Sequence, residues 1–230
     1  MYNKSRPQPI LGPINVYGIL ALAGVVGPLV LIITDLTAAF SEPGYDLIRD
    51  SISSLALTPM GSVQTIGFLA IGLLVEVFVA GLLFSIRGRR GFGLSLGLLV
   101  CFGFGLLVIG AFRTDPAGAS STIEGMIHSV TATTVFWLFP IAILLLAPSL
   151  RNDPHWENIF AYTVVTSVLA LALMTGQVCL PAQLSWFGLY ERILVANTVI
   201  WVEVIAFCLL RLSLGREQED KTLNLSEEQR

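Results

Sequence analysis

The stretch GSVQTIGFLAIGLLVEVFVAGLLFSI, residues 61–86, contains one charged residue, Glu76, and no proline. A helix of about 20 residues crosses a hydrocarbon core about 30 Å thick, so this stretch is long enough to span a membrane. It lacks the strict apolar–polar alternation of a barrel strand and is about twice the length of one. Because a backbone inside a bilayer must make its hydrogen bonds internally, the stretch is predicted to be a transmembrane helix.

Five further apolar runs of similar length lie at residues 14–40, 91–112, 125–146, 159–180 and 188–210. The chain of 230 residues is 54% hydrophobic and 13% charged, whereas an average soluble domain is about 25% charged. This composition excludes a water-soluble globule, a disordered chain and a nucleic-acid-binding protein. The sequence therefore predicts an all-α, polytopic membrane protein with six transmembrane helices in residues 14–210.

The distribution of positive charge predicts the orientation. If the six helices cross alternately, Arg49, Arg113 and Arg192 fall on one side and the other ten of the thirteen Lys and Arg residues fall on the opposite side. Because positive residues favour the cytoplasmic side, both termini are predicted to be cytoplasmic, in the cell (inner) membrane. Residues 1–13 would form a cytoplasmic N-terminal segment. Residues 211–230 are polar, and we expect them to form a disordered cytoplasmic tail.

The placement of histidine and cysteine argues against metal and haem chemistry. His128 is predicted near the outer end of the fourth helix and His155 in the following cytoplasmic loop, so most of a membrane thickness separates them. The three cysteines lie inside predicted helices without metal-ligand spacing. P-loop, dinucleotide-binding and serine-hydrolase motifs are also missing from the sequence. We expect no metal site and no cofactor.

Every predicted outer loop places an arginine beside or near a carboxylate: Arg49 with Asp50, Arg113 with Asp115, and Arg192 with Glu191. The first of these loops, residues 41–61, carries apolar residues at helical spacing, namely Leu47, Ile48, Ile52, Leu55 and Ala56. The spacing predicts a short amphipathic helix at the outer interface. Its polar face would carry Asp46, Arg49, Asp50 and Ser53.

Two motifs in the outer loops resemble a known family. The segments EPGYD (42–46) and DSISSLA (50–56), followed by GLL (72–74), form the first motif, and GAFRTDP (110–116) with GMIH (125–128) forms the second. They are similar to bacterial and archaeal membrane proteins grouped as domain of unknown function 998, over roughly residues 14–210. The resemblance implies a six-helix integral membrane protein and brings no established activity. The family-like outer positions are Asp50, Ser51, Ser53, Leu55, Asp115, Pro116, Gly125 and His128.

These outer polar residues have two interpretations. In the first, they cross-link the loops and cap the helices. In the second, they line an outward-facing polar pocket, where Arg49, Arg113 and Arg192 would hold the anionic headgroup of a lipid or isoprenoid-like amphiphile. Three polar residues near the outer helix ends would face the same pocket: Asp35, Gln177 and Asn197. We expect a non-catalytic protein that binds or helps to move such a molecule.

Catalysis is the alternative. An intramembrane lipid-modifying enzyme would use Asp50, Asp115 and His128 as acid, base or orienting groups, and Ser51 or Ser53 as nucleophile. A third hypothesis is an assembly subunit of a membrane complex, which a co-purifying membrane-protein partner would reveal.

Two carboxylates are predicted deep in the membrane. Glu76 and Glu203 lie at similar depth on the second and sixth helices, where an ionisable group is costly and marks a candidate functional site. The alternative is that each is protonated and hydrogen-bonded between helices. The Gly93–Gly97 step of the third helix permits close helix approach, within the bundle or between two copies in a homo-oligomer.

Overall fold

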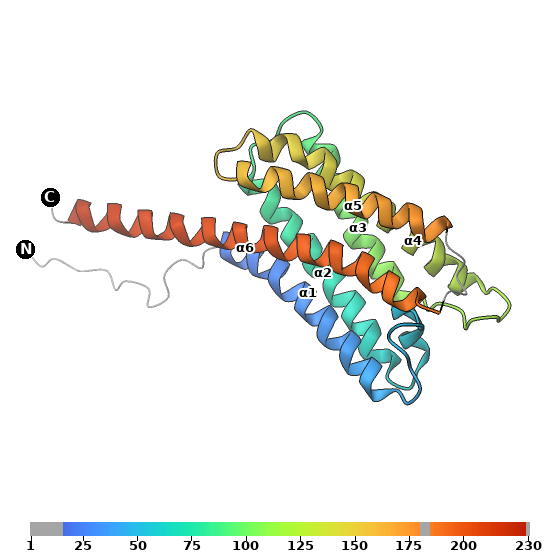
Figure 1. The fold of residues 1–230 in the computed structure, drawn as a ribbon. Helices are drawn as coiled ribbons and strands as arrows, with labels where there is room; N and C mark the ends of the chain where they lie inside the picture. The colour runs from blue at the N-terminus through green and yellow to red at the C-terminus, as the bar shows by residue number, and fades with distance from the viewer. Residues whose placement is uncertain (1–15, 180–184, 229–230) are drawn as a thin grey trace, which may run out of the picture.

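A computed structural model describes residues 16–179 and 185–228 of the chain. The described residues form six long helices and two short 3₁₀ helices (Figure 1). In chain order these are α1 (Val16–Ser41), η1 (Ile52–Leu57), α2 (Gly61–Ser85), α3 (Phe92–Ala111), α4 (Ile123–Arg151), η2 (Glu157–Ile159), α5 (Phe160–Cys179) and α6 (Phe187–Glu228).

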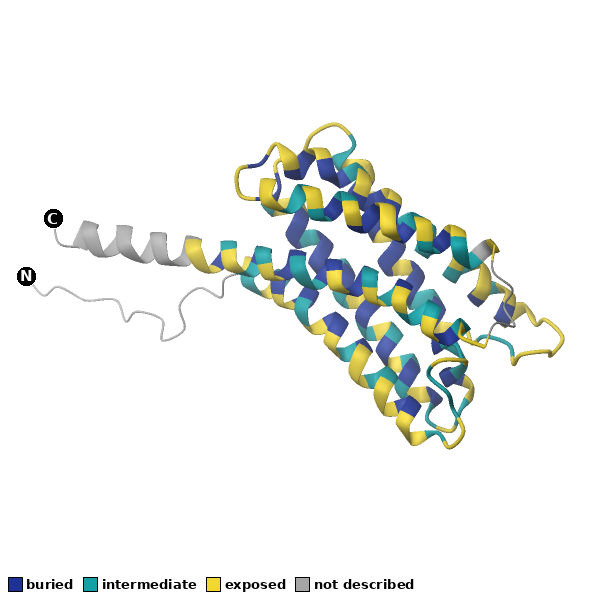
Figure 2. Cartoon of the chain, viewed as in Figure 1, coloured by how far each residue is buried: buried dark blue, intermediate teal, exposed yellow. Residues whose placement is uncertain are grey.

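All six long helices are long and apolar enough to cross a membrane. The protein is therefore a multi-pass, all-α membrane protein, as the hydropathy of the sequence predicts. The observed bounds of α2 and α3 agree with the predicted runs to within one residue, whereas α4 continues past residue 146 to Arg151. Large apolar side chains remain exposed on all six long helices, where lipid would cover them. Exposed residues follow the outside of the bundle in Figure 2.

The helices form a closed ring. Each long helix packs against the next one in the sequence, and α6 returns to pack against α1. Much of the interior is occupied by one large apolar cluster that includes Phe78, Phe102, Phe139 and Trp201. The Phe139 ring meets the Trp201 indole edge-on, with centroids 5.6 Å apart. The side chains that belong to this cluster are buried between the helices.

The bundle has two ends, which we name by one residue each. The Tyr45 end carries residues 42–60, residues 112–122 and the beginning of α6, and the Arg87 end carries residues 86–91 and 152–159. The first residues of α1 lie beside α6 at the Arg87 end, from which α6 projects beyond the bundle (Figure 1).

Two local expectations differ from the structure. Residues 211–228, expected to be part of a disordered tail, continue α6 as helix. The segment contains no proline and is rich in Glu and Leu, which have high helix propensity.

The loop predicted as one amphipathic helix is divided into turns over residues 42–50 and the 3₁₀ helix η1. The division occurs at Ser51, whose backbone is extended (φ −68°, ψ 151°) and whose side chain caps η1 by accepting a hydrogen bond from Ser54 N–H. The expected apolar face is retained in part, because Ile52, Leu55 and Ala56 are buried.

Candidate functional site: a cavity that opens between two helices

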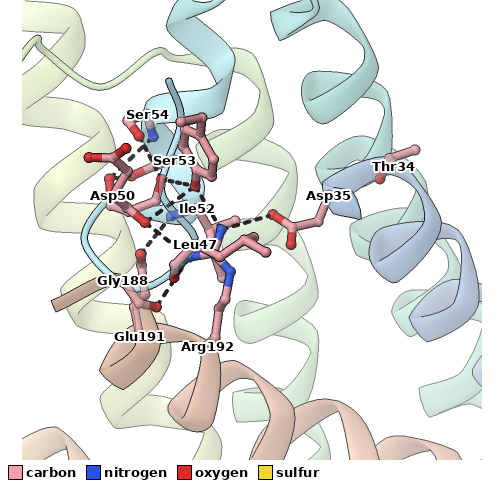
Figure 3. A network of polar contacts seen from close by, with 12 residues as sticks. Thr34, Asp35, Leu47, Asp50, Ile52, Ser53, Ser54, Gly188, Glu191 and Arg192 are labelled. Carbon is pink, nitrogen blue, oxygen red and sulfur yellow. Dashed lines mark hydrogen bonds and ion pairs between the residues drawn. The ribbon is translucent and has the colours of Figure 1, made fainter. Parts of the chain in front are cut away.

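Arg192 binds the α1–α2 loop to α6 (Figure 3). Its Nη1 donates to the backbone oxygens of Leu47 and Asp50, both at 2.9 Å, and to that of Gly188 at 3.2 Å. Its Nη2 donates to the Tyr45 hydroxyl at 2.7 Å. A guanidinium has five donors in a planar fork, so one side chain can satisfy several carbonyls of a turn that makes no regular ladder.

Asp35 of α1 faces this guanidinium across the interval between α1 and α6 (Figure 3). Its Oδ1 lies 3.7 Å from Arg192 Nη2, and both side chains are largely buried, with 15% and 17% of their surfaces exposed. Asp35 lies about 9 Å of helix before Ser41, so the pair sits inside the apolar zone rather than on a loop tip. This ion pair joins α1 and α6 near the Tyr45 end of the bundle.

Tyr45 completes the arginine network from the loop. Its hydroxyl accepts from Arg192 and donates to the backbone oxygen of Ser51 at 2.8 Å. Burial raises the pKa of this hydroxyl above its ordinary value of 10.0, by more than the adjacent guanidinium lowers it. Tyr45 therefore remains protonated and retains its donor hydrogen at neutral pH.

The beginning of α6 lies directly against the loop backbone. Gly188 N–H and Leu189 N–H donate to the backbone oxygens of Arg49 and Ile48, at 3.2 and 3.0 Å. A Cβ at Gly188 would overlap the backbone of Asp50, so only glycine fits there. Glu191 accepts the Ile52 N–H at 2.7 Å through Oε2. These bonds satisfy the first donors of η1 and α6.

A cavity of about 290 Å³ lies below this network, inside the ring. Its volume is near the lower end of the range for ligand pockets, about 300–1,000 Å³. Helices α1, α2, α3, α4 and α6 supply apolar walls that include Leu31, Ile71, Phe102, Leu106, Phe136 and Val199. Its polar lining consists of Asp35, Ser53, His128, Glu191, Arg192 and Thr198.

The cavity opens sideways rather than only toward the loop. Ile32 and Leu36 of α1 and Ile200 of α6 line it, and their side chains are also 40–54% exposed on the outside of the bundle. The opening therefore lies between α1 and α6, on a surface that faces lipid. A molecule dissolved in the bilayer would reach the cavity without crossing water.

His128 is held in a defined orientation on α4. Its Nδ1 lies 2.8 Å from the backbone oxygen of Phe112. Because a carbonyl can only accept, Nδ1 carries the hydrogen, and in the neutral ring Nε2 is an acceptor. The side chain is 4% exposed and lines the cavity, and within the described residues no hydrogen bond reaches Nε2.

The α3–α4 loop forms a separate polar cluster at the same end. Asp115 accepts from Thr122 N–H at 2.9 Å and from the Thr122 hydroxyl at 2.7 Å, and these bonds hold the pKa of its carboxyl below the ordinary value of 3.8. Glu124 accepts the Arg113 N–H at 2.8 Å. Asp115, Arg113 and Glu124 do not line the cavity, so the structure gives them the loop-bracing arrangement described by the first interpretation.

The structure brings together only part of the predicted set. Asp35, Ser53, His128 and Arg192 share the cavity, whereas Arg49, Asp50, Ser51, Arg113 and Asp115 lie outside it. Arg49 forms an exposed ion pair with Asp46, and Asp50 accepts the Asp46 N–H. The three arginines therefore do not converge on one headgroup site.

The remaining predicted residues lie elsewhere in the bundle. Asn197 donates to the Thr166 backbone oxygen at 3.3 Å and joins α6 to α5. The Gln177 side-chain oxygen is buried and has no hydrogen-bond partner among the described residues. Glu76 lines a separate shallow groove between α2 and α3 with Gly93 and Gly97. One oxygen each of Glu76 and Glu203 is buried without a hydrogen bond. Within residues 16–179 and 185–228, no group of three His, Cys, Asp or Glu side chains could hold a metal ion.

Tyr45 was not predicted to belong to the site, and Glu191 was noted only as the carboxylate beside Arg192. Both could have been found from the sequence, because GLYER (188–192) places a charged pair at membrane depth just after a glycine, and EPGYD (42–46) places a tyrosine just after a turn. Neither pattern indicates that the two segments touch, and this contact is what makes the network.

The fold and the cavity define a six-helix, multi-pass membrane protein with a polar network over an apolar chamber that opens toward lipid. A family model for proteins of unknown function (DUF998) matches residues 25–208. The chain belongs to this family, in agreement with the resemblance of its two loop motifs. No curated protein and no solved structure matches the chain.

Proposed function

We propose that the protein binds a lipid-like amphiphile in the cavity between α1 and α6, with the apolar chain in the chamber and the head beneath the Arg192 network. By the predicted orientation, the ligand would come from the outer leaflet of the cell membrane. The observation that carries the proposal is the combination of apolar walls, a sideways opening and a polar end in one cavity.

The volume of the cavity supports a single chain. At about 290 Å³ it is small for a drug-sized ligand, and the opening lets the rest of a larger lipid stay in the bilayer. Each methylene buried from water contributes about 0.8 kcal/mol, but a chain that comes from lipid gains little from the hydrophobic effect. Selection therefore depends on packing against the walls and on the polar groups at the end of the cavity.

Binding is tested by filling the chamber. Ala132 lines the cavity on α4, and the adjacent Thr133 is exposed on the outside of the same helix. We expect Ala132→Phe to abolish retention of a co-purified lipid, measured by native mass spectrometry after gentle extraction, while the matched control Thr133→Phe leaves it unchanged. Equal retention of lipid by both variants would contradict the proposal.

A second candidate function, hydrolysis of an acyl ester, is favoured by one observation: Ser53 and His128 line the same cavity. His128 Nε2 would take the Ser53 proton as Oγ bonds to the acyl carbon, and would return it to the leaving alcohol as the ester C–O bond breaks. Water would then cleave the acyl-serine. In the structure Ser53 Oγ lies 3.4 Å from Ser51 Oγ and makes no hydrogen bond to His128 in the described part of the chain, so substrate binding would have to bring the two groups together.

Covalent labelling separates the two functions. A lipid-like fluorophosphonate would label Ser53 in an enzyme, and the label would be lost in Ser53→Ala and in His128→Ala. Ser54→Ala is the matched control, because Ser54 bonds only to the Ser51 backbone oxygen through its hydroxyl. Lipid retention without labelling of Ser53 would favour binding alone.

A further inference from the structure

Most hydrogen-bond donors of Arg192 are already used within the protein. Both Nη1 hydrogens are directed at backbone oxygens and one Nη2 hydrogen at the Tyr45 hydroxyl, while Asp35 Oδ1 lies 3.7 Å from Nη2, an ion-pair distance longer than a hydrogen bond. The remaining donor, Nε, is buried without a partner and has no surface open to the cavity. The arginine that the sequence indicated as an anion holder therefore has at most one accessible donor left for a ligand, an Nη2 hydrogen beside the Asp35 carboxyl.

When the two carboxyl groups are ionised, the open positions in the cavity are acceptors. Within the described residues, no hydrogen bond reaches Asp35 Oδ2, Glu191 Oε1 or His128 Nε2. Thr198 uses its hydrogen on the Leu194 backbone oxygen at 3.3 Å. Ser53 is the one polar side chain of the cavity lining with a hydroxyl that can still serve as donor, because its contact with Ser51 at 3.4 Å fixes no direction. With both carboxyls ionised, three open acceptors thus face the cavity, whereas the available donors are the Ser53 hydroxyl and at most one Nη2 hydrogen of Arg192.

The charge of the cavity lining also disfavours an anionic head. One guanidinium and two carboxyl groups line the polar end. If either carboxyl is ionised, it offsets the arginine, and if both are ionised the lining carries a net negative charge. A buried, unpaired anion in such a place is costly, whereas a head that donates hydrogen bonds satisfies acceptors that are otherwise left open.

We infer that the cavity selects amphiphiles whose head donates hydrogen bonds and carries no negative charge, such as a long-chain alcohol or amine, over anionic lipids. This inference rests on the proposed binding function and names its ligand class. Asp35 Oδ2 and His128 Nε2 receive the hydrogens of the head. Anionic phospholipids and fatty acids are excluded, because they would place a second set of acceptors against the first.

The test compares three ligands of one chain length on the purified full-length protein in nanodiscs of neutral lipid. Decanol, decylamine and decanoate compete at pH 8 with a fluorescent decyl probe, and the Ala132→Phe variant measures displacement that does not involve the cavity. After this correction we expect the alcohol, the amine or both to displace the probe at concentrations at least about tenfold below decanoate, which corresponds to about 1.4 kcal/mol. Decanoate that binds as tightly as both others, or more tightly, would overturn the inference.

A variant tests the assignment to Asp35. Asp35→Asn keeps the size of the side chain and removes its negative charge, so we expect it to shrink the preference for the alcohol or amine over decanoate by at least threefold. If this variant does not fold, His128→Gln replaces it, with the same expectation for the alcohol. An unchanged preference in the folded variant would contradict the assignment. If the probe binds wild type and Ala132→Phe equally, the proposed binding function itself fails. If the probe binds only wild type but the three ligands compete equally, binding stands and only the head selection fails.

Discussion

Helices α1 and α6 meet in two different ways along their length. Toward the Arg87 end they are in close contact: a Cβ placed on Gly24 would lie 2.7 Å from Ala206 Cβ and 2.5 Å from the Phe78 ring. Toward the Tyr45 end the same helices separate around the cavity and are joined by the 3.7 Å ion pair of Asp35 and Arg192. Small residues close one half, and polar contacts span the other.

The difference shows how one helix pair can be closely packed at one end and border a cavity at the other. Close packing of small residues is the usual way in which helices associate in lipid, where the hydrophobic effect contributes little. In the open half, no side chain in the described part of the chain fills the cavity between the helices. Arg192 instead holds the α1–α2 loop over the cavity through hydrogen bonds. The stability of this half should therefore depend on a few polar atoms, whereas that of the closed half should depend on shape.

Removing the arginine should have the largest effect. Arg192→Met leaves the Leu47 and Asp50 oxygens and the Asp35 carboxyl without their donor, and loss of one partner from a buried polar network costs about 3–5 kcal/mol. We expect a large fall in the thermal unfolding temperature in detergent. Arg49→Met, at a side chain that is 70% exposed, is the control and should change it little. Equal effects of the two substitutions would show that the network does not hold the open half.

Overfilling the closed half should come next. Gly24→Leu forces side-chain atoms into Phe78 and Ala206, and overpacking of this kind costs about 1–3 kcal/mol. The same change at Gly97, which has nothing within 4 Å, is the control and should leave stability unchanged or raise it, because glycine is a poor helix former. Chemical denaturation in mixed micelles would measure both. A Gly24→Leu protein as stable as the control would mean that shape does not close this half.

The Arg87 end provides a pH test. Burial raises the pKa of Asp153, but hydrogen bonds from the Arg87 and His155 N–H groups and the His155 imidazole lower it by more, so the pKa lies below its ordinary value of 3.8. Because the folded pKa is depressed, this carboxylate stabilises the protein above pH 3.8, and the contribution is lost as the pH falls through the folded pKa.

Asp153→Ala should therefore lower stability at pH 7 by about 2 kcal/mol, the order of a hydrogen bond to a charged group. The loss should shrink as the pH falls below 3.8, in thermal unfolding measured across that range. If the stability lost in Asp153→Ala stays constant down to the lowest pH at which the protein is folded, this role for Asp153 is contradicted.

The smallest effect is expected at Tyr45. Tyr45→Phe removes one hydroxyl, which donates to the Ser51 backbone oxygen and accepts from Arg192. A cost of about 1 kcal/mol is typical of one such group. Faster proteolysis of the α1–α2 loop, with little change in global unfolding, would place the effect in the open half. The control is Tyr162→Phe in α5, which should not change proteolysis of that loop.

The sequence predicts the six helices well, because apolar length is a local property that residues 61–86 already display. It cannot predict the ring, since the contact of Gly24 with Ala206 depends on two helices far apart in the chain. The site divides in the same way. His128 and Arg192 are visible as polar residues at helix ends, but the use of Arg192 on backbone oxygens depends on a loop whose turns no side-chain pattern reveals.

The same reason explains the loop itself. The apolar spacing of residues 47–56 is helical, and the structure keeps Ile52 and Leu55 buried. Ser51 breaks the segment because its side chain caps η1, and Asp46 accepts the Ile48 N–H and holds a turn before it. Such short-range hydrogen bonds give the backbone an alternative to a helix, and apolar periodicity does not predict them.

The central claim is that a chain from the bilayer enters between α1 and α6, and photo-crosslinking tests it most directly. A long-chain alcohol with a diazirine in its tail would be irradiated in nanodiscs with the full-length protein, and the labelled residues would be mapped by mass spectrometry. The account predicts labelling of Phe102 and Leu106, which line the cavity and are at most 5% exposed. Labelling confined to lipid-facing residues such as Leu73 and Phe104, which are 59% and 62% exposed, would contradict it.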